Sequence, residues 1–263
     1  MKSNLITLTE DIEIARHDWL RQPNQQALWQ CHRALTNLCR SLHTFDDKSA
    51  VVYAKRWQKI ADDLEPLLHC YNLTMRLQAS APPELLNKLA SALSALMLGP
   101  EATVKKRFDS QKWRRLRGWW REFIDAIEPD QLQGSSDSSL PKAVHRLFKY
   151  RDRAFKDPSL KQWQKLRTAS LALEEQLSNI EPPIENEYGD LLAICQLLND
   201  YLERWHWLQA QLPLIKALRK SPQLQGGNKA MGLLDRQLDQ VNAECHVLLE
   251  RCREALAGLD GKV

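Results

Sequence analysis

The chain has few glycines and no long apolar run, and both absences narrow its class. Only nine of its 263 residues are glycine, whereas sheets with many tight turns use more of it, because glycine adopts the backbone conformations that such turns need. No apolar run approaches the roughly 18 residues of a membrane-spanning helix, and residues 1–10 lack the order of a secretory signal. We therefore expect a cytoplasmic protein without a membrane partner.

Motifs that hold metals or carry out catalysis are also missing. The six cysteines include no C-x-x-C pair, the seven histidines are scattered, and no H-E-x-x-H, phosphate-binding glycine loop or G-x-S-x-G turn occurs. We expect reduced thiols buried in the core, no metal, no cofactor and no enzymatic activity. The cysteines are Cys31, Cys39, Cys70, Cys195, Cys245 and Cys252.

Residues that favour helices dominate, and apolar side chains recur at steps of three and four. One helix is expected after Pro23-Asn24, with Asn24 as its N-cap. Pro82-Pro83 is expected to open another and Gly99-Pro100 to close it. The fold class predicted is all-α. The other helices are expected at residues 57–71, 113–127, 142–155, 158–180, 188–220 and 229–259.

The polar stretch 128–141 is rich in Gly, Ser and Pro and predicts a central linker. It separates a first helical bundle, 1–127, from a second, 142–263. Both halves carry Trp-Gln-x-x-Arg near a helix start, at Trp29 and at Trp163. An internal duplication into two pseudo-symmetric bundles explains the repeat, although two short matches also arise by chance.

Positive charge is concentrated in the middle of the chain. Residues 105–167 contain 17 Lys or Arg against 8 Asp or Glu, although the whole chain has a net charge of only +4. This segregation favours an anionic partner. Arg114, Arg117 and Arg121 are expected on one helix face, opposite an apolar stripe that begins at Trp113. Past the linker, Arg146, Lys149 and Arg153 repeat that spacing.

A polar set in the first half also shares one helix face: Gln30, Arg33, Asn37 and Arg40. Such a stripe lines a solvated groove in one interpretation and is a plain outer face in the other. Basic runs carry the same ambiguity, because most of them are solvated surfaces.

These patterns resemble the conserved histidine α-helical domain (CHAD) family, whose two halves each carry a helix with a motif like H-x-x-R. The similar segments here are Gln30-Cys31-His32-Arg33 and Gln164-Lys165-Leu166-Arg167, together with residues 191–200 and the basic aromatic segment 112–116. Gln30 and Gln164 occupy the places of the signature histidines, so the chain resembles a degenerate member.

The resemblance implies a site for a polyanion, since CHAD domains bind polyphosphate between two helical bundles. The hypothesis is a CHAD-like module that binds inorganic polyphosphate or another anionic polymer through a basic surface or cleft. The residues expected to bind it are Arg33, Arg40, Lys105, Lys106, Arg107, Arg114, Arg117, Arg121, Arg146, Lys149, Arg153, Lys165 and Arg167, supported by Gln30, Asn37 and Gln164.

Two alternatives remain open. A protein-interaction scaffold that has lost the anion site is consistent with the two glutamines. Non-specific binding of nucleic acid is consistent with aromatic residues among the charges, at Trp119, Phe148 and Tyr150. No helix-turn-helix, zinc-finger or RNA-binding motif indicates sequence-specific recognition.

Overall fold

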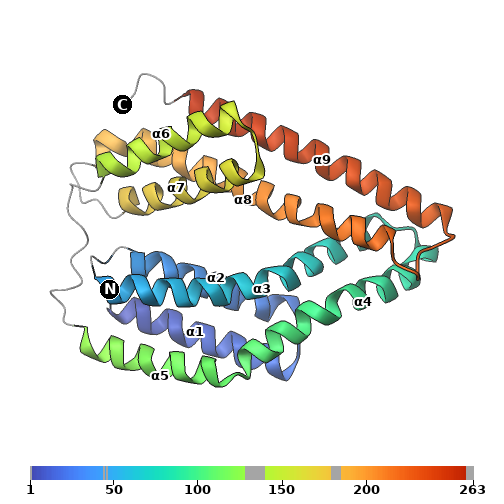
Figure 1. Cartoon of the computed structure of the whole chain (residues 1–263), viewed down its shortest axis with the longest axis horizontal. Coiled ribbons are helices and arrows are strands. Elements are labelled where there is room, and N and C mark those ends of the chain that lie inside the picture. Colours follow the sequence, from blue (N-terminus) through green and yellow to red (C-terminus); the bar gives the residue numbers. More distant parts are fainter. Residues whose placement is uncertain (1, 44, 46, 128–139, 179–184, 259–263) are drawn as a thin grey trace. The chain divides into compact units, whose positions relative to one another are not determined.

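The computed structural model describes residues 2–43, 45, 47–127, 140–178 and 185–258. Within these ranges the chain forms nine α-helices and no strand (Figure 1), which confirms the all-α class. The helices are α1 (Lys2–Arg21), α2 (Gln25–His43), α3 (Lys48–Ser80), α4 (Pro83–Phe108), α5 (Gln111–Ala126), α6 (Leu140–Lys156), α7 (Leu160–Ser178), α8 (Glu185–Arg219) and α9 (Asn228–Ala257).

The helices form two compact units, and the first of these is discontinuous in sequence. It combines Met1–Gly134 with Pro213–Gln237, and the second combines Ser135–Leu212 with Leu238–Val263. The segment 213–237 comprises the end of α8, the turn after it and the start of α9, and it belongs to the first unit although it follows the predicted linker. Within that unit Lys229 lies 3.1 Å from Glu84, and the Arg76 side chain donates to Gln237 at 2.8 Å. The predicted linker lies outside the described residues up to residue 139, and α6 begins at Leu140.

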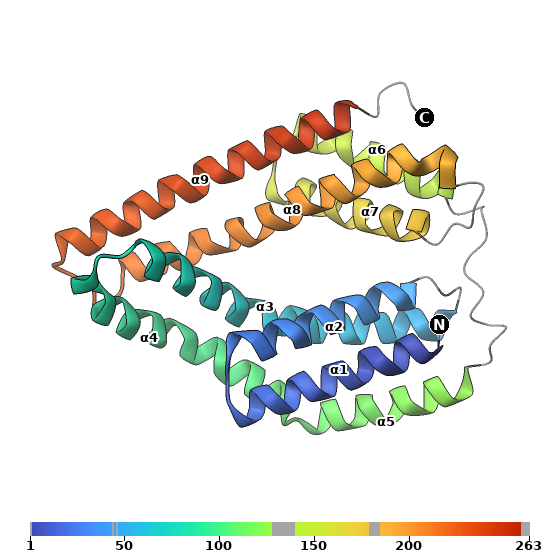
Figure 2. The same cartoon turned by 180° about the vertical axis from the view of Figure 1, so that it is seen from behind.

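A cluster of buried aromatic rings holds the first unit together. Trp57 of α3 is 1% exposed, and its ring centroid lies 5.7 Å from that of Trp113 and 5.9 Å from that of Trp120, both on α5. Phe108, at the end of α4, packs edge-on against Trp113 and against Trp19 of α1, each at 5.6 Å. The cluster thus joins α1, α3, α4 and α5, all of which are labelled in Figure 2.

Two indole groups of this cluster donate hydrogen bonds to α1. Trp113 Nε1 donates to the Glu13 carboxylate at 3.1 Å, and Trp120 Nε1 donates to the Thr9 hydroxyl at 2.8 Å. A buried indole N–H is usually paired in this way. These bonds fix the rotation of α5 about its axis, and with it the direction in which its charged residues point.

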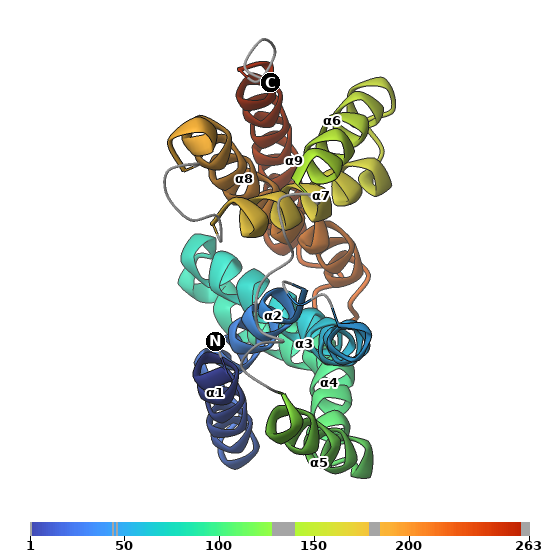
Figure 3. The same ribbon diagram turned by 90° about the vertical axis from the view of Figure 1, so that its left-hand side faces the viewer.

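The second unit is built on the α6–α7 pair, together with the part of α8 up to Leu212 and the part of α9 from Leu238. Figure 3 shows α6 next to α7. Trp163 of α7 and Trp205 of α8 are buried with their centroids 6.4 Å apart, and the Asn199 amide donates to Glu174 at 2.5 Å. On α9, the Arg253 guanidinium lies 6.0 Å from the centroid of Phe155 on α6.

Most helix ends lie close to the predicted ones, but two predictions are wrong. The helix expected at 57–71 spans Lys48–Ser80, and the other concerns Gly99-Pro100. Asn24 is the N-cap of α2, since its side chain accepts from Ala27 N at 2.8 Å. Gly99-Pro100 does not end a helix: α4 continues through Pro100 to Phe108. Proline costs the helix a hydrogen bond there. However, Leu93 and Val104 on either side are both buried on one face, so packing against the core overrides the local signal.

α1 is not among the predicted helices. Its buried residues Leu5, Ile12 and Trp19 lie next to exposed Ile6 and Ile14 in the sequence, which blurs the apolar stripe. The helix lengths repeat along the chain: α1 to α4 have 20, 19, 33 and 26 residues, and α6 to α9 have 17, 19, 35 and 30. This order agrees with a duplication in which α5 has no counterpart, and the duplication itself stays a prediction.

All six cysteines are buried, as expected of core residues. Burial raises the pKa of Cys39, Cys195 and Cys252 to about 12 and the pKa of Cys70 to about 11, and it also raises the pKa of Cys31. The thiols therefore stay protonated and shielded at neutral pH.

We expect the native protein to react slowly with a thiol reagent at pH 8, because the thiolate is the reactive form. Denatured protein should show six reactive thiols at once. Since folding raises these pKa values, the thiols also stabilise the fold below about pH 9, and that contribution falls as pH rises toward 12. Rapid modification of the native thiols at pH 8 would contradict the burial.

Replacing Trp57 with alanine should lower the free energy of unfolding by about 3–5 kcal/mol, the usual cost of deleting a buried aromatic ring. The matched control is Trp119→Ala, which removes an indole that is 47% exposed and should cost about 1 kcal/mol, mainly through a lost cation–π contact. Urea unfolding of both variants measures the difference. Equal losses would show that the Trp57 cluster is not central to the unit.

Candidate anion-binding surfaces

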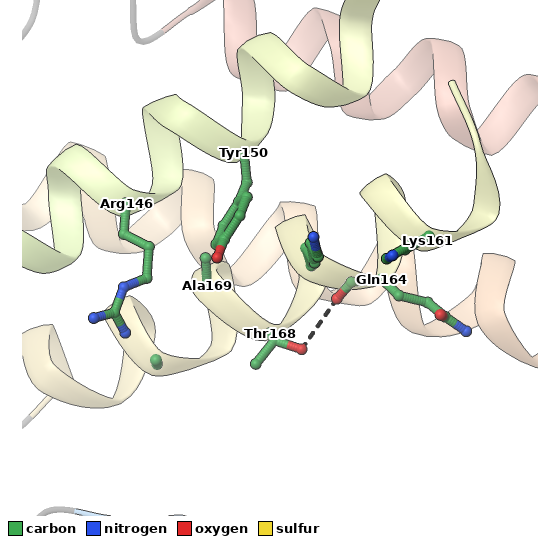
Figure 4. A pocket seen from close by; sticks show the side chains of 8 residues that line it. Arg146, Tyr150, Lys161, Gln164, Thr168 and Ala169 are labelled. Carbon is green, nitrogen blue, oxygen red and sulfur yellow. Dashed lines mark hydrogen bonds between the residues drawn. The ribbon is translucent and has the colours of Figure 1, made fainter. Parts of the chain in front are cut away.

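A basic hollow lies in the second unit, between α6 and α7. It has a volume of about 470 Å³ and is lined by Arg146, Tyr150, Lys161, Gln164, Lys165, Thr168, Ala169 and Ala172. Figure 4 shows Arg146 and Tyr150 on α6 and Lys161, Gln164 and Thr168 on α7. A second hollow of the same volume follows along α6 and is lined by Pro141, Lys142, His145, Arg146, Lys149 and Tyr150. Because they share Arg146 and Tyr150, we treat the two hollows as one α6–α7 groove.

The sequences of the two helices explain why the cations gather in this groove. α6 buries Val144 and Leu147, and α7 buries Trp163 and Leu166. Burial of these residues turns the basic positions of both helices toward solvent or to a half-buried setting. Ala169 and Ala172 line the hollow with small side chains.

The charge in the groove is not neutralised by the protein. Among the described residues, the five cations that line it form no ion pair with a carboxylate, and none of its lining residues is acidic. The hydroxyl of Thr168 donates to the Gln164 carbonyl at 3.0 Å, so it offers a ligand only its lone pairs (Figure 4). The five cations are Lys142, Arg146, Lys149, Lys161 and Lys165.

The structure brings together four of the predicted site residues in this groove: Arg146, Lys149, Gln164 and Lys165. Arg153 is exposed farther along α6, with its guanidinium 6.0 Å from the Tyr150 ring centroid. Arg167 does not line the hollow. It is only half exposed, its Nε is buried, and it leaves α7 on the side of Trp163 and Leu166.

Sequence reasoning missed Lys142, Lys161 and Thr168. A usable signal exists, since Lys161, Lys165 and Thr168 follow one another at steps of four and three and so share one face of α7 with Gln164. Tyr150 was singled out as an aromatic among charges, and it lines the groove.

The predicted basic residues of the first unit lie mainly on α5 and at the end of α4. Arg114, Arg117 and Arg121 are exposed, but they do not lie opposite the buried stripe. Arg117 Nη1 is 3.5 Å from the Glu13 carboxylate of α1, because four residues turn a helix by only about 40° from Trp113. This arginine stripe therefore flanks the core on the side of α1.

Arg107 is held by the protein itself. It forms an ion pair and a hydrogen bond with Asp63 of α3, while its neighbours Lys105 and Lys106 are exposed in the last turn of α4. Cations in a last turn also interact favourably with the helix dipole. Arg107 is thus the member of this group least available to a ligand.

The polar set on α2 is divided by the structure. Gln30 and Arg33 are exposed, whereas Asn37 and Arg40 are half-buried. Gln30 lines a hollow of about 640 Å³ between the end of α1 and the start of α2, which also contains the oppositely charged Asp18 and Arg21. Its mixed charge makes this hollow a weaker anion site than the α6–α7 groove.

No protein-family model matches the chain, and a search of curated proteins finds no significant match. Over the described residues, each helix is too short or too polar to cross a bilayer.

Proposed function

We propose that the chain is a CHAD-like binding module rather than an enzyme, and that its second unit binds an anionic polymer such as inorganic polyphosphate in the α6–α7 groove. One observation carries the proposal: five cations line two hollows that share Arg146 and Tyr150, and the described residues supply these cations with no carboxylate partner. Unpaired cations that share a concave surface attract and retain anions more effectively than cations spread over a convex face.

The residue types suit a chain of phosphates. Arg146 lies where the two hollows meet and offers a planar fork of donors that can bind phosphate through two hydrogen bonds, while the lysines act as point charges. Tyr150 adds a hydroxyl that can donate. Repeating charge along two neighbouring helices fits a polymer better than a single small anion.

The arginine stripe on α5 is the second candidate surface for the same ligand. Arg117 already has Glu13 as a partner, so binding there competes with an existing ion pair. The stripe is also not part of a described hollow. We therefore rank it below the groove.

The triple variant Arg146→Gln, Lys161→Gln and Lys165→Gln should bind polyphosphate substantially more weakly than the wild type, because it removes three unpaired cations. The slope of log affinity against log salt concentration should also become shallower, by roughly 0.7–0.9 per lost contact, as for nucleic acids. Titration by calorimetry at several salt concentrations measures both effects.

A matched control removes the same number of positive charges at other positions. It carries Lys88→Gln, Lys216→Gln and Lys220→Gln, all of which are exposed and outside the groove. It should retain nearly all of the affinity. Equal losses in the two triple variants would reduce the effect to net charge and contradict a groove site.

The variant Arg114→Gln, Arg117→Gln and Arg121→Gln tests the ranking. Its stability should change by no more than about 0.5 kcal/mol per position, as for most surface substitutions, and its loss of affinity should be smaller than that of the groove variant. A larger loss would move the proposed site to α5. Absence of polyphosphate binding at low salt would favour the protein-interaction scaffold instead.

A further inference from the structure

A second surface of different chemistry lies on the first unit, where α3 meets α5. Its centre is Trp119, which is 47% exposed although the neighbouring Trp120 is buried. The Arg56 guanidinium of α3 lies 5.2 Å from the centroid of the Trp119 ring. Tyr53 of α3 donates its hydroxyl to the Trp119 carbonyl oxygen at 2.9 Å. Arg56 thus contacts the indole and Tyr53 holds the backbone at this position, while 47% of the residue faces solvent.

Positive charge surrounds this indole on both helices. On α5, Lys112 and Arg115 precede Trp119 by seven and four residues and so lie on the same stripe, and both are exposed. On α3, Lys59 follows Arg56 by three residues and is also exposed. Among the described residues these four cations form no ion pair with a carboxylate. We call Arg56, Lys59, Lys112, Arg115 and Trp119 the Trp119 surface.

Two boundaries limit this surface. Glu122 lies one turn beyond Trp119 and close enough to Tyr53 to help raise its pKa, to which burial contributes most. Asp63, one turn beyond Lys59, is neutralised by Arg107. The apolar part of this surface is small. Besides Trp119, it contains Val52 of α3, which is 46% exposed and lies one turn before Arg56.

We propose that the Trp119 surface binds single-stranded nucleic acid, with an unpaired base stacked on the indole and the adjoining phosphates held by the four cations. An exposed ring among cations is the arrangement that such ligands need, because every base has a flat face and every nucleotide a charge. Polyphosphate has nothing to stack, and the bases of a duplex are already stacked on one another. A bilayer surface would gain little from one indole and one valine.

The test compares a short oligothymidylate with an abasic oligomer of equal length and charge, both fluorescently labelled, by anisotropy at low salt. The readout is the ratio of the two affinities, which isolates the contribution of the bases. Wild-type protein should prefer the oligothymidylate by roughly 5- to 150-fold, as expected for one stacked base. Trp119→Leu should bring the ratio close to one, whereas Trp119→Phe, which keeps a ring, should preserve a clear preference.

A charge variant and the groove variant separate this inference from the proposed function. Arg56→Gln with Lys59→Gln should weaken binding of both oligomers and make it less dependent on salt, by roughly 0.7 in slope per contact. The groove variant Arg146→Gln, Lys161→Gln and Lys165→Gln should leave the affinity ratio unchanged even where it abolishes polyphosphate binding. Unfolding curves establish that each variant is folded.

A wild-type ratio near one, or a ratio that Trp119→Leu leaves intact, would overturn the proposal. Binding to anionic lipid vesicles that depends on Trp119, together with a ratio near one, would identify a membrane surface and overturn it as well. None of these outcomes bears on the groove, because the groove is tested with a ligand that has no bases.

Discussion

The hydrogen bonds that two buried indoles donate to α1 determine how the basic helix α5 sits on the first unit. Trp113 and Trp120 are both buried, and their N–H groups reach Glu13 and Thr9 of α1. With α5 fixed in this rotation, the stripe of Arg114, Arg117 and Arg121 leaves on the side of α1, and Trp119 leaves with Arg115 on the side of α3. The distribution of charge on the surface is thus a consequence of packing in the core. In the second unit, burial of Trp163 and Leu166 orients α7 through packing alone.

Similar residue types serve different purposes in the two units because their surroundings differ. Arg107 and Arg117 lie beside carboxylates that already compensate their charge, and a ligand would have to displace those contacts. The cations of the α6–α7 groove and of the Trp119 surface have no such competitor among the described residues. A count of basic residues along the sequence cannot distinguish these cases, since the carboxylates concerned belong to helices far away in the chain.

Much of the fold follows from the sequence, because apolar periodicity, caps and the low glycine content are local properties. Asn24 caps α2 as expected, and the stripe that begins at Trp113 is buried. The failures occur where tertiary packing prevails over local preference, at Pro100 inside α4 and in α1 with its mixed stripe. For the candidate site, four predicted residues meet in one groove. Lys161 and Thr168 are not predicted, because their role depends on which face of α7 is buried.

The discontinuity of the first unit has a consequence for how the protein is made. Its last segment, Pro213–Gln237, leaves the ribosome only after the whole stretch Ser135–Leu212 has been synthesised. Until then, the ends of α3 and α4 lack the residues that form contacts such as those of Glu84 and Arg76. The first half of the chain therefore cannot complete its own unit during translation. Because so long a loop must close first, the final assembly of both units comes late. Their folding is therefore coupled more tightly than the folding of two bundles in tandem.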